Sequence, residues 1–304
     1  MFGASKRGSE SGFAAEFACA SDLGGREDQQ DRVAAFRFGD ALLLALADGM
    51  GGHEGGAMAA QAVIDAAERL IADGEEVSPE RLLRRVAACA NRRIAAKAEK
   101  RGWQSGSTCV LLHLEPSRAT WAHIGDSRLY FFDNDRLAGR TLDHSLVENL
   151  RLKGKVSAEE MKSHPDRNRL LDALGVSPQP QIECGGRRTA PTDGFLLCSD
   201  GLWENVSDFD LERAMGAVNL QSGLDRLLRR AKGNGGVDCD NISVAAARYK
   251  RYALSSISPW RRIFKNSKHQ RRRAIFGILN ASISNQMPIT NCNSKPIKKP
   301  TKLM

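Results

Sequence analysis

Four aspartates each stand at the edge of a short apolar run that is typical of a buried β-strand. Asp48 directly follows such a run, and Asp200 follows one after a single serine. Each of them precedes a glycine. Asp126 lies between two runs, next to a glycine, and Asp240 comes just before the last run of the chain. A strand fixes the position of such a carboxylate, and a neighbouring glycine lets an ion or its waters approach the backbone.

Carboxylates that a fold brings together repel one another unless cations neutralise them. Ligand sets made only of oxygen atoms favour hard ions such as Mg²⁺ or Mn²⁺ over zinc. An aspartate in a turn is the ordinary explanation of any one of these residues. Four of them, all at strand edges, favour a site for divalent cations.

The aspartates need a framework that positions them, and the hydrophobic periodicity predicts one. Strands are predicted at 13–20, 33–38, 41–47, 108–114, 119–124, 128–132, 194–198 and 242–248. Helices are predicted at 56–72, from the capping Ser78 to about Lys100, after the capping box 157–160, at 207–215 and at 220–232, where Gly233 should end the helix. Many strands follow one another with no helix between them, which argues for antiparallel pairing in an α+β fold.

The composition indicates a soluble globular protein, with 41% apolar and 27% charged residues in 304. No run of about 18 apolar residues occurs, so we expect no membrane-spanning helix. The seven cysteines are odd in number and form no CxxC pair. This favours buried cysteines in a reducing cytoplasm over disulfides or a zinc site.

The net charge of +9 is unevenly distributed along the chain. Residues 250–304 hold 13 of the 45 Lys and Arg and none of the acidic residues, so the rest carries 32 basic and 36 acidic residues, a net charge of −4. We therefore predict an N-terminal extension at 1–11, a globular domain at 12–249, and a basic, disordered or weakly helical tail at 250–304.

Seven motifs occur in an order that resembles the metal-dependent PPM family of protein phosphatases, also called protein phosphatase 2C-like, in its bacterial stand-alone form. They are Arg26-Glu-Asp-Gln-Gln-Asp31, Ala47-Asp-Gly-Met-Gly-Gly-His53, Gly106-Ser-Thr108, Gly125-Asp-Ser-Arg128, Thr141-Leu-Asp-His-Ser145, Ser199-Asp-Gly-Leu-Trp203 and Asp240-Asn241-Ile242. The resemblance covers roughly residues 12–249, and the ordered motifs make it specific. It implies a sandwich of two antiparallel β-sheets flanked by antiparallel helix pairs, which agrees with the α+β pattern.

The resemblance also implies which residues bind metal ions. Asp48 would bridge two ions, and the carbonyl oxygen of Gly49 would bind one of them. Asp200 and Asp240 would hold the other ion. Asp126 would bind a third, weaker ion together with Asp200. The implied cofactors are two or three Mn²⁺ or Mg²⁺ ions.

Two further side chains would act on the substrate and on water. Arg26 would bind the substrate phosphate through its forked donors, and Asp31 would orient metal-bound water. The implied reaction is hydrolysis of phosphoserine or phosphothreonine in proteins, by direct attack of a hydroxide that bridges two metal ions. Such a reaction needs no phosphoenzyme, and Cys198 and Ser199 are expected only to pack within their strand.

Two positions depart from the family pattern. Gln30 stands where members often have Glu, which would lower the affinity for metal, although bacterial members often have Gln there. Met50 stands where some eukaryotic members have a His that has been proposed as a general acid. His53 is expected to be structural, whereas a place for His144 near the site stays open.

Other functions stay open at this stage. An inactive family member would bind phosphoproteins as a regulator, and a metal phosphohydrolase of another kind would act on nucleotides or small phosphates. No glycine loop of the P-loop or Rossmann type supports nucleotide binding. The basic segment 150–174, which corresponds to a variable flap in the family, would be a solvated surface or a contact for phosphorylated substrates.

Partners follow from the same resemblance. We expect the partners to be phosphorylated proteins and a cognate serine/threonine kinase, with an association with type VI secretion as one option. We expect the protein to be a monomer in the cytoplasm. No nucleic acid is expected at the domain. The tail, with Trp260, Phe264 and Phe276 among its basic residues, would be a solubilising extension or would contact anionic lipid or nucleic acid.

Overall fold

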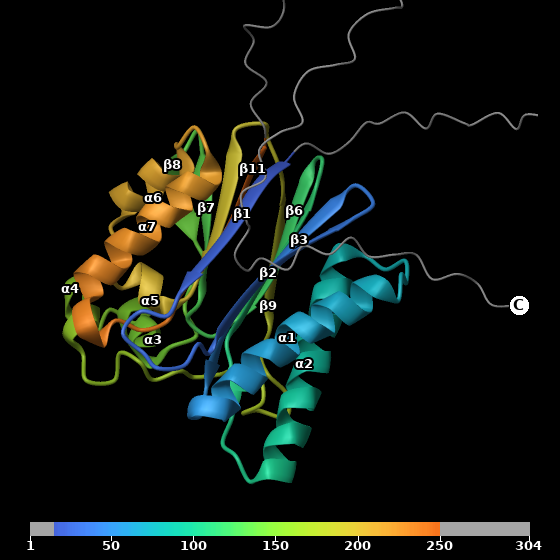
Figure 1. Cartoon of the computed structure of the whole chain (residues 1–304), viewed down its shortest axis with the longest axis vertical. Coiled ribbons are helices and arrows are strands. Elements are labelled where there is room, and N and C mark those ends of the chain that lie inside the picture. Colours follow the sequence, from blue (N-terminus) through green and yellow to red (C-terminus); the bar gives the residue numbers. More distant parts are fainter. Residues whose placement is uncertain (1–14, 250–304) are drawn as a thin grey trace, which may run out of the picture. The chain divides into compact units, whose positions relative to one another are not determined.

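Two antiparallel β-sheets lie face to face at the centre of the computed structural model, which describes residues 15–249 (Figure 1). The predicted extension at 1–11, the tail at 250–304 and the start of the first predicted strand lie outside the described residues. The first sheet has the order β1 (Ala15–Asp22), β11 (Ile242–Tyr249), β10 (Asp193–Cys198), β7 (Arg128–Asp133) and β8 (Arg136–Arg140). The second has the order β2 (Asp31–Phe38), β3 (Ala41–Met50), β5 (Cys109–Glu115), β6 (Arg118–Ile124) and β9 (Glu183–Arg188), with β4 (Gly106–Ser107) paired to β3.

Alternation along the strands builds the core between the two sheets, because successive side chains of a strand point to opposite faces. In β3, Leu42, Leu44 and Leu46 pack toward the other sheet, whereas Leu43 and Ala45 pack toward helices. All five are fully buried. The near-continuous apolar run of β3 therefore marks a strand that is covered on both faces.

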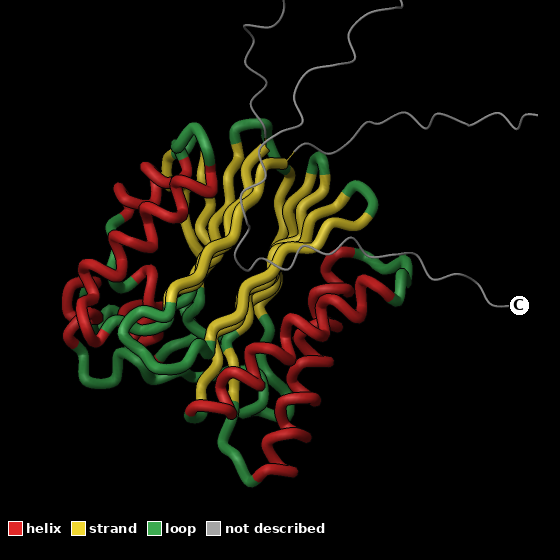
Figure 2. Tube along the Cα trace, in the orientation of Figure 1, coloured by secondary structure: helices red, strands yellow, loops and turns green. Residues whose placement is uncertain are grey.

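A pair of helices covers the outer face of each sheet (Figure 2). Helices α1 (His53–Ala72) and α2 (Pro79–Arg101) lie on the second sheet, and α6 (Asp208–Met215) and α7 (Leu220–Gly235) lie on the first. The Ser78 side chain accepts a hydrogen bond from the Arg81 amide, which confirms the predicted start of α2. The predicted α+β sandwich with flanking helix pairs is confirmed.

The chain between β8 and β9 forms the flap segment, residues 141–182, beside one end of the sandwich. It contains α3 (Leu146–Leu152) and α4 (Ala158–Ser163). The predicted capping box opens α4, because the Ser157 and Glu160 side chains each bond the backbone of the other. Two short elements complete the fold. Helix α5 (Asp200–Trp203) follows β10, and the 3₁₀ helix η1 (Gly236–Asp238) follows α7.

One predicted boundary is wrong. Helix α7 continues through Gly233 to Gly235, and it ends where Gly236 adopts a φ of 65°. A glycine inside a helix costs only about 1 kcal/mol, whereas a left-handed residue ends the hydrogen-bond ladder. Among residues 15–249, no helix is long and apolar enough to span a bilayer.

Candidate functional site

The side chains packed between the two sheets are apolar along most of the sandwich and become polar at one end. At this end α1 begins and α5 lies (Figure 1). Continuing the period-2 alternation, Asp48 follows Leu46 on this face, and Asp31 is its direct partner in the β2–β3 register. Residues opposite each other across an antiparallel pair have their side chains on the same face. The two carboxylates therefore lie side by side at the end of the inter-sheet core.

Asp31 is buried, with an exposed fraction of 2%. Its Oδ2 accepts a hydrogen bond of 2.7 Å from the hydroxyl of Ser199, which directly follows β10 of the other sheet. Burial raises the pKa of Asp31 to about 8, and the nearby charges of Asp200 and Asp240 add to the increase. These effects oppose ionisation of Asp31, so a cation close to it would favour its carboxylate form.

Burial and repulsion between carboxylates also raise the pKa of three of the predicted metal ligands. Burial raises the pKa of Asp48 well above its usual value, and Asp31, Asp200 and Asp126 repel its charge further. The pKa of Asp126 rises for the same reasons, with Asp200 as its strongest repelling neighbour. Burial together with Asp240 raises the pKa of Asp200 to about 7. These carboxylates, which come from sequence positions far apart, thus converge on one small region.

Asp240 lies at the exposed side of this region and pairs with Arg26. The Arg26 guanidinium donates to Asp240 Oδ2 at 2.8 Å, with exposed side-chain fractions of 57% and 42%. The other carboxylate oxygen of Asp240 accepts from the Asn241 amide at 2.7 Å. The residue predicted to bind phosphate is therefore held beside a residue predicted to bind metal.

Close backbone contact explains the glycines around the predicted carbonyl ligand. A Cβ added to Gly49 would lie 2.0 Å from the carbonyl oxygen of Gly56, in the first turns of α1. A Cβ added to Gly56 would lie 2.0 Å from Oε1 of Gln30. Both glycines are required for α1 to begin against the end of β3, where Gln30 packs beside Gly49. Gln30 thus contacts the predicted site, although it carries no charge.

Three positioning residues were not predicted from the sequence. The Ser199 hydroxyl, expected only to pack, donates to Asp31 and also accepts a hydrogen bond of 3.0 Å from the Ser243 amide. The Thr108 hydroxyl accepts from the Asp48 amide at 3.0 Å. Asn241 accepts from the Gln30 amide at 2.7 Å and donates to the Leu23 carbonyl at 2.9 Å. Each belongs to a quoted motif, so membership in these motifs was the available signal.

His144 belongs to a separate polar group. His123, His144 and Glu183 bring one possible ligand atom each within 4.8 Å of one another, and the two imidazole rings stack with centroids 4.8 Å apart. Nε2 of His123 lies 3.0 Å from the Leu142 carbonyl oxygen, and burial lowers the pKa of His123. This group joins β6, β9 and the loop before α3. It does not contain any residue of the predicted aspartate site.

The donor set fits hard divalent cations. Its members are carboxylate oxygens and one backbone carbonyl, the ligands that Mg²⁺ and Mn²⁺ prefer. The raised pKa values of Asp31, Asp48, Asp126 and Asp200 report repulsion between carboxylates that positive charge would relieve. A fold that concentrates buried and half-buried carboxylates in this way is suited to binding metal ions there.

Comparisons with known proteins agree with this arrangement. The family model described as protein phosphatase 2C matches residues 21–235. The serine/threonine protein phosphatase PstP of Mycobacterium tuberculosis is 34% identical over 249 residues, which cover 80% of this chain and 46% of that protein, so the chain spans about half the length of this relative. The serine/threonine phosphatase stp of Listeria welshimeri is 34% identical over 233 residues, covering 72% of this chain and 89% of the relative.

Solved structures show the same fold. The catalytic domain of PstP, in complex with two manganese ions, has a TM-score of 0.67 at 32% identity, with 77% of this chain and 98% of that chain covered. PppA of Pseudomonas aeruginosa, described as a key regulatory component of its type VI secretion system, has a TM-score of 0.67 at 28% identity, with 78% and 98% covered.

Proposed function

Because the chain belongs to the protein phosphatase 2C family, we propose that it hydrolyses phosphoserine and phosphothreonine in proteins with the help of divalent cations. The observation that carries the proposal is the convergence of Asp31, Asp48, Asp126 and Asp200 at one end of the sandwich, where each has a raised pKa. Asp240 and Arg26 border the same region. Such a set can neutralise phosphate only when it holds cations.

The proposed ligands for two or three Mn²⁺ or Mg²⁺ ions are Asp48, the Gly49 carbonyl, Asp126, Asp200 and Asp240. When bound, such ions make water nucleophilic near neutral pH and offset the negative charge of a phosphoryl group. The solved PstP domain with two manganese ions supports this choice of metal.

We assign Arg26 to the substrate phosphate. Its guanidinium has five N–H donors in a planar fork, so it can keep its bond to Asp240 and still donate to a phosphate oxygen. More than half of its side chain is exposed, which leaves room for a substrate to approach. The pairing would place phosphate next to Asp240.

We assign Asp31 to the attacking water. In its ionised form, which cations in the site would favour, the carboxylate can accept a hydrogen bond from water and orient it. The Ser199 hydroxyl already fixes Oδ2, which limits rotation of the carboxylate. The Ser243 amide in turn holds Ser199, so the positioning chain ends in the backbone of β11.

The experiment compares release of phosphate from a phosphothreonine peptide with Mn²⁺ and with EDTA, for the wild type and for Asp200→Ala. We expect turnover only with metal, and a loss of about 100-fold or more in the variant. Asp238→Ala is the matched control, because Asp238 is exposed and close in sequence to Asp240 but lies outside the proposed ligand set. Its turnover should match that of the wild type.

A folded wild-type protein without turnover at any divalent ion would refute the proposal. Binding of phosphopeptide without turnover would then favour the inactive regulator, and Gln30→Glu would be the first substitution to test. Faster hydrolysis of a free nucleotide than of the peptide would instead favour the small-phosphate hydrolase.

The remaining partners are proposed with the same function. We propose phosphorylated proteins as substrates and a cognate serine/threonine kinase as the opposing enzyme, in the cytoplasm. The likeness to PppA supports an association with type VI secretion as one setting. We further propose that residues 12–249 form the catalytic domain as a monomer, and that the basic residues of 250–304 contact anionic surfaces.

A further inference from the structure

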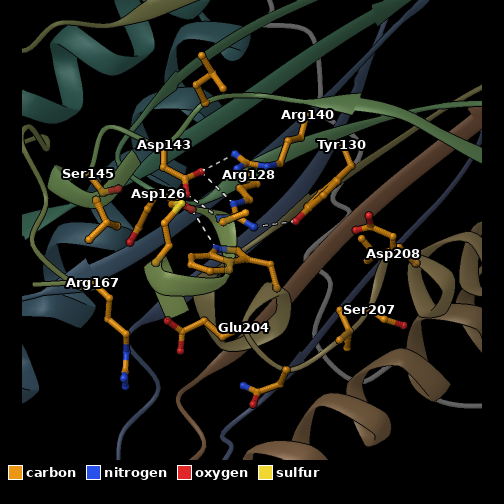
Figure 3. A pocket seen from close by; sticks show the side chains of 18 of the residues that line it. Asp126, Arg128, Tyr130, Arg140, Asp143, Ser145, Arg167, Glu204, Ser207 and Asp208 are labelled. Atoms are coloured by element: carbon orange, nitrogen blue, oxygen red, sulfur yellow. Dashed lines mark hydrogen bonds and ion pairs between the residues drawn. The ribbon is translucent and has the colours of Figure 1, made fainter. Parts of the chain in front are cut away.

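A cavity of about 970 Å³ opens beside the aspartate site, between the flap segment and α6 (Figure 3). Asp126 forms part of its wall, so the cavity is continuous with the proposed catalytic centre. Val147 and Met161 line it from the flap helices α3 and α4, and Val206 and Phe209 line it from the loop before α6 and from α6. The two walls therefore come from segments that are separate in sequence.

Three of the four arginines that line the cavity, Arg128, Arg140 and Arg151, are paired with carboxylates. Arg128 donates to both oxygens of Asp143, at 2.9 and 2.7 Å, as the dashed lines in Figure 3 show. Arg140 donates to Asp143 at 3.1 Å and lies 3.5 Å from Glu148. The Arg128 guanidinium also lies 3.5 Å from the centroid of the Trp203 ring. The lining holds four arginines and four acidic residues, so it carries no excess positive charge and is a poor site for a second phosphate.

The apolar part of the wall remains available to a ligand. Phe209 is 62% exposed, which is high for a large apolar side chain. Met161 and Val206 are only half-buried. An apolar group that filled the cavity would remove these surfaces from water. Burial of apolar surface is the main favourable contribution to the free energy of binding in such pockets.

We propose that this cavity binds an apolar side chain of the phosphoprotein substrate, located within a few residues of the phosphorylated residue. The inference rests on the proposed function. An extended chain spans at most about 3.3–3.6 Å per residue, so when the phosphate lies at the aspartates, a side chain a few residues away can reach the cavity whose wall includes Asp126. The volume is enough for a side chain with part of its backbone. The flap would then select substrates by sequence and not only by charge.

The test uses full-length protein with Mn²⁺ and a set of phosphothreonine peptides in a Ser/Gly background. Leu is placed in turn at each of the three positions on either side of the phosphothreonine. We expect one position to raise kcat/KM about tenfold over the peptide without Leu. In Met161→Ala of α4 and in Phe209→Ala of α6, this gain should fall to about threefold or less.

Leu152→Ala is the matched control, because Leu152 is a 59% exposed flap residue that does not line the cavity. It should keep both the turnover and the gain from Leu. A wild type that hydrolyses the peptides equally well at every Leu position would overturn the inference and leave the proposed function intact. A gain that both cavity variants retain would also overturn it. Absence of turnover on all peptides would instead refute the proposed function.

Discussion

Asp31→Asn should make the ion-free protein more stable than the wild type, by an amount that grows from pH 5 to pH 7. Asp31 is buried among other carboxylates, and its pKa is raised from 3.8 to about 8. Between these two values the unfolded chain is ionised while the folded protein keeps the proton. The wild type therefore loses stability as the pH rises, whereas Asn, which mimics the protonated carboxyl group, does not titrate.

The magnitude follows from the linkage between protonation and folding. One such group changes the free energy of unfolding by about 1.4 kcal/mol per pH unit, and thus by at most about 2.7 kcal/mol from pH 5 to pH 7. For a domain of this size, about 1 kcal/mol shifts Tm by roughly 2–4 °C. The advantage of Asp31→Asn in Tm should therefore increase by roughly 5–10 °C over this range.

Two histidines titrate in the same range, and their contribution cancels in the comparison. Burial lowers the pKa of His113 and His123, so their contribution to stability rises as the pH approaches the ordinary value of 6.5. Both proteins share this contribution. The carboxylates with lowered pKa values, such as Glu148, act only at lower pH.

The assay is thermal unfolding in EDTA at pH 5, 6 and 7, with Asp238→Asn as an exposed control that should track the wild type. Saturating Mn²⁺ should stabilise the wild type at pH 7, because an ion that binds only the folded state raises Tm. A difference between Asp31→Asn and the wild type that stays constant or shrinks with pH would refute the reasoning. It would mean that Asp31 is already ionised in the folded, ion-free protein.

Two further predictions concern positioning and domain limits. Ser199→Ala should lower the free energy of unfolding by about 1–3 kcal/mol in chemical denaturation, because it leaves the Ser243 amide without this partner and removes one of the hydrogen bonds to Asp31. Ser21→Ala, which removes a hydroxyl that bonds the Ser243 hydroxyl, is the control, and an equal cost would contradict this role. Removal of residues 255–304 should leave kcat/KM on a phosphothreonine peptide unchanged within about twofold. Loss of activity in the folded, shortened protein would show that the proposed domain boundary is wrong.

Local patterns predicted most of the secondary structure. The capping serines at 78, 157 and 207 each accept a hydrogen bond at the start of a helix, because a cap depends on residues within one turn. The strands β8 and β9 were missed, since β9 contains two adjacent glycines and little apolar sequence. The end of α7 was misplaced because three glycines near it compete for the stop.

The family resemblance supplied what periodicity could not. Alternation indicates which residues share a face of a strand, and it placed the predicted aspartates at strand edges. It does not say which strands pair, because pairing of β1 with β11 joins residues at opposite ends of the domain. The order of seven motifs implied the two-sheet sandwich, which the structure confirms.

The cavity beside Asp126 could not have been predicted from composition alone. The flap sequence is rich in basic residues, which suggested a charged contact surface. In the structure, Arg151 of the flap and Arg140 of β8 both pair with the buried Glu148. A cation and its partner can be identified only when their distance is known, and the remaining apolar surface is evident only after these pairs are placed.

The sequence by itself predicted which residues could bind metal and phosphate, since residue types, neighbouring glycines and the order of motifs can all be read along the chain. Tertiary structure alone decided their electrostatic state. The pKa of Asp31 depends on burial and on Asp200 and Asp240, and its oxygen is held by Ser199, which is 168 positions away in the chain. Coulomb interactions and hydrogen bonds depend on distance in space, so they exist only after folding brings these residues together.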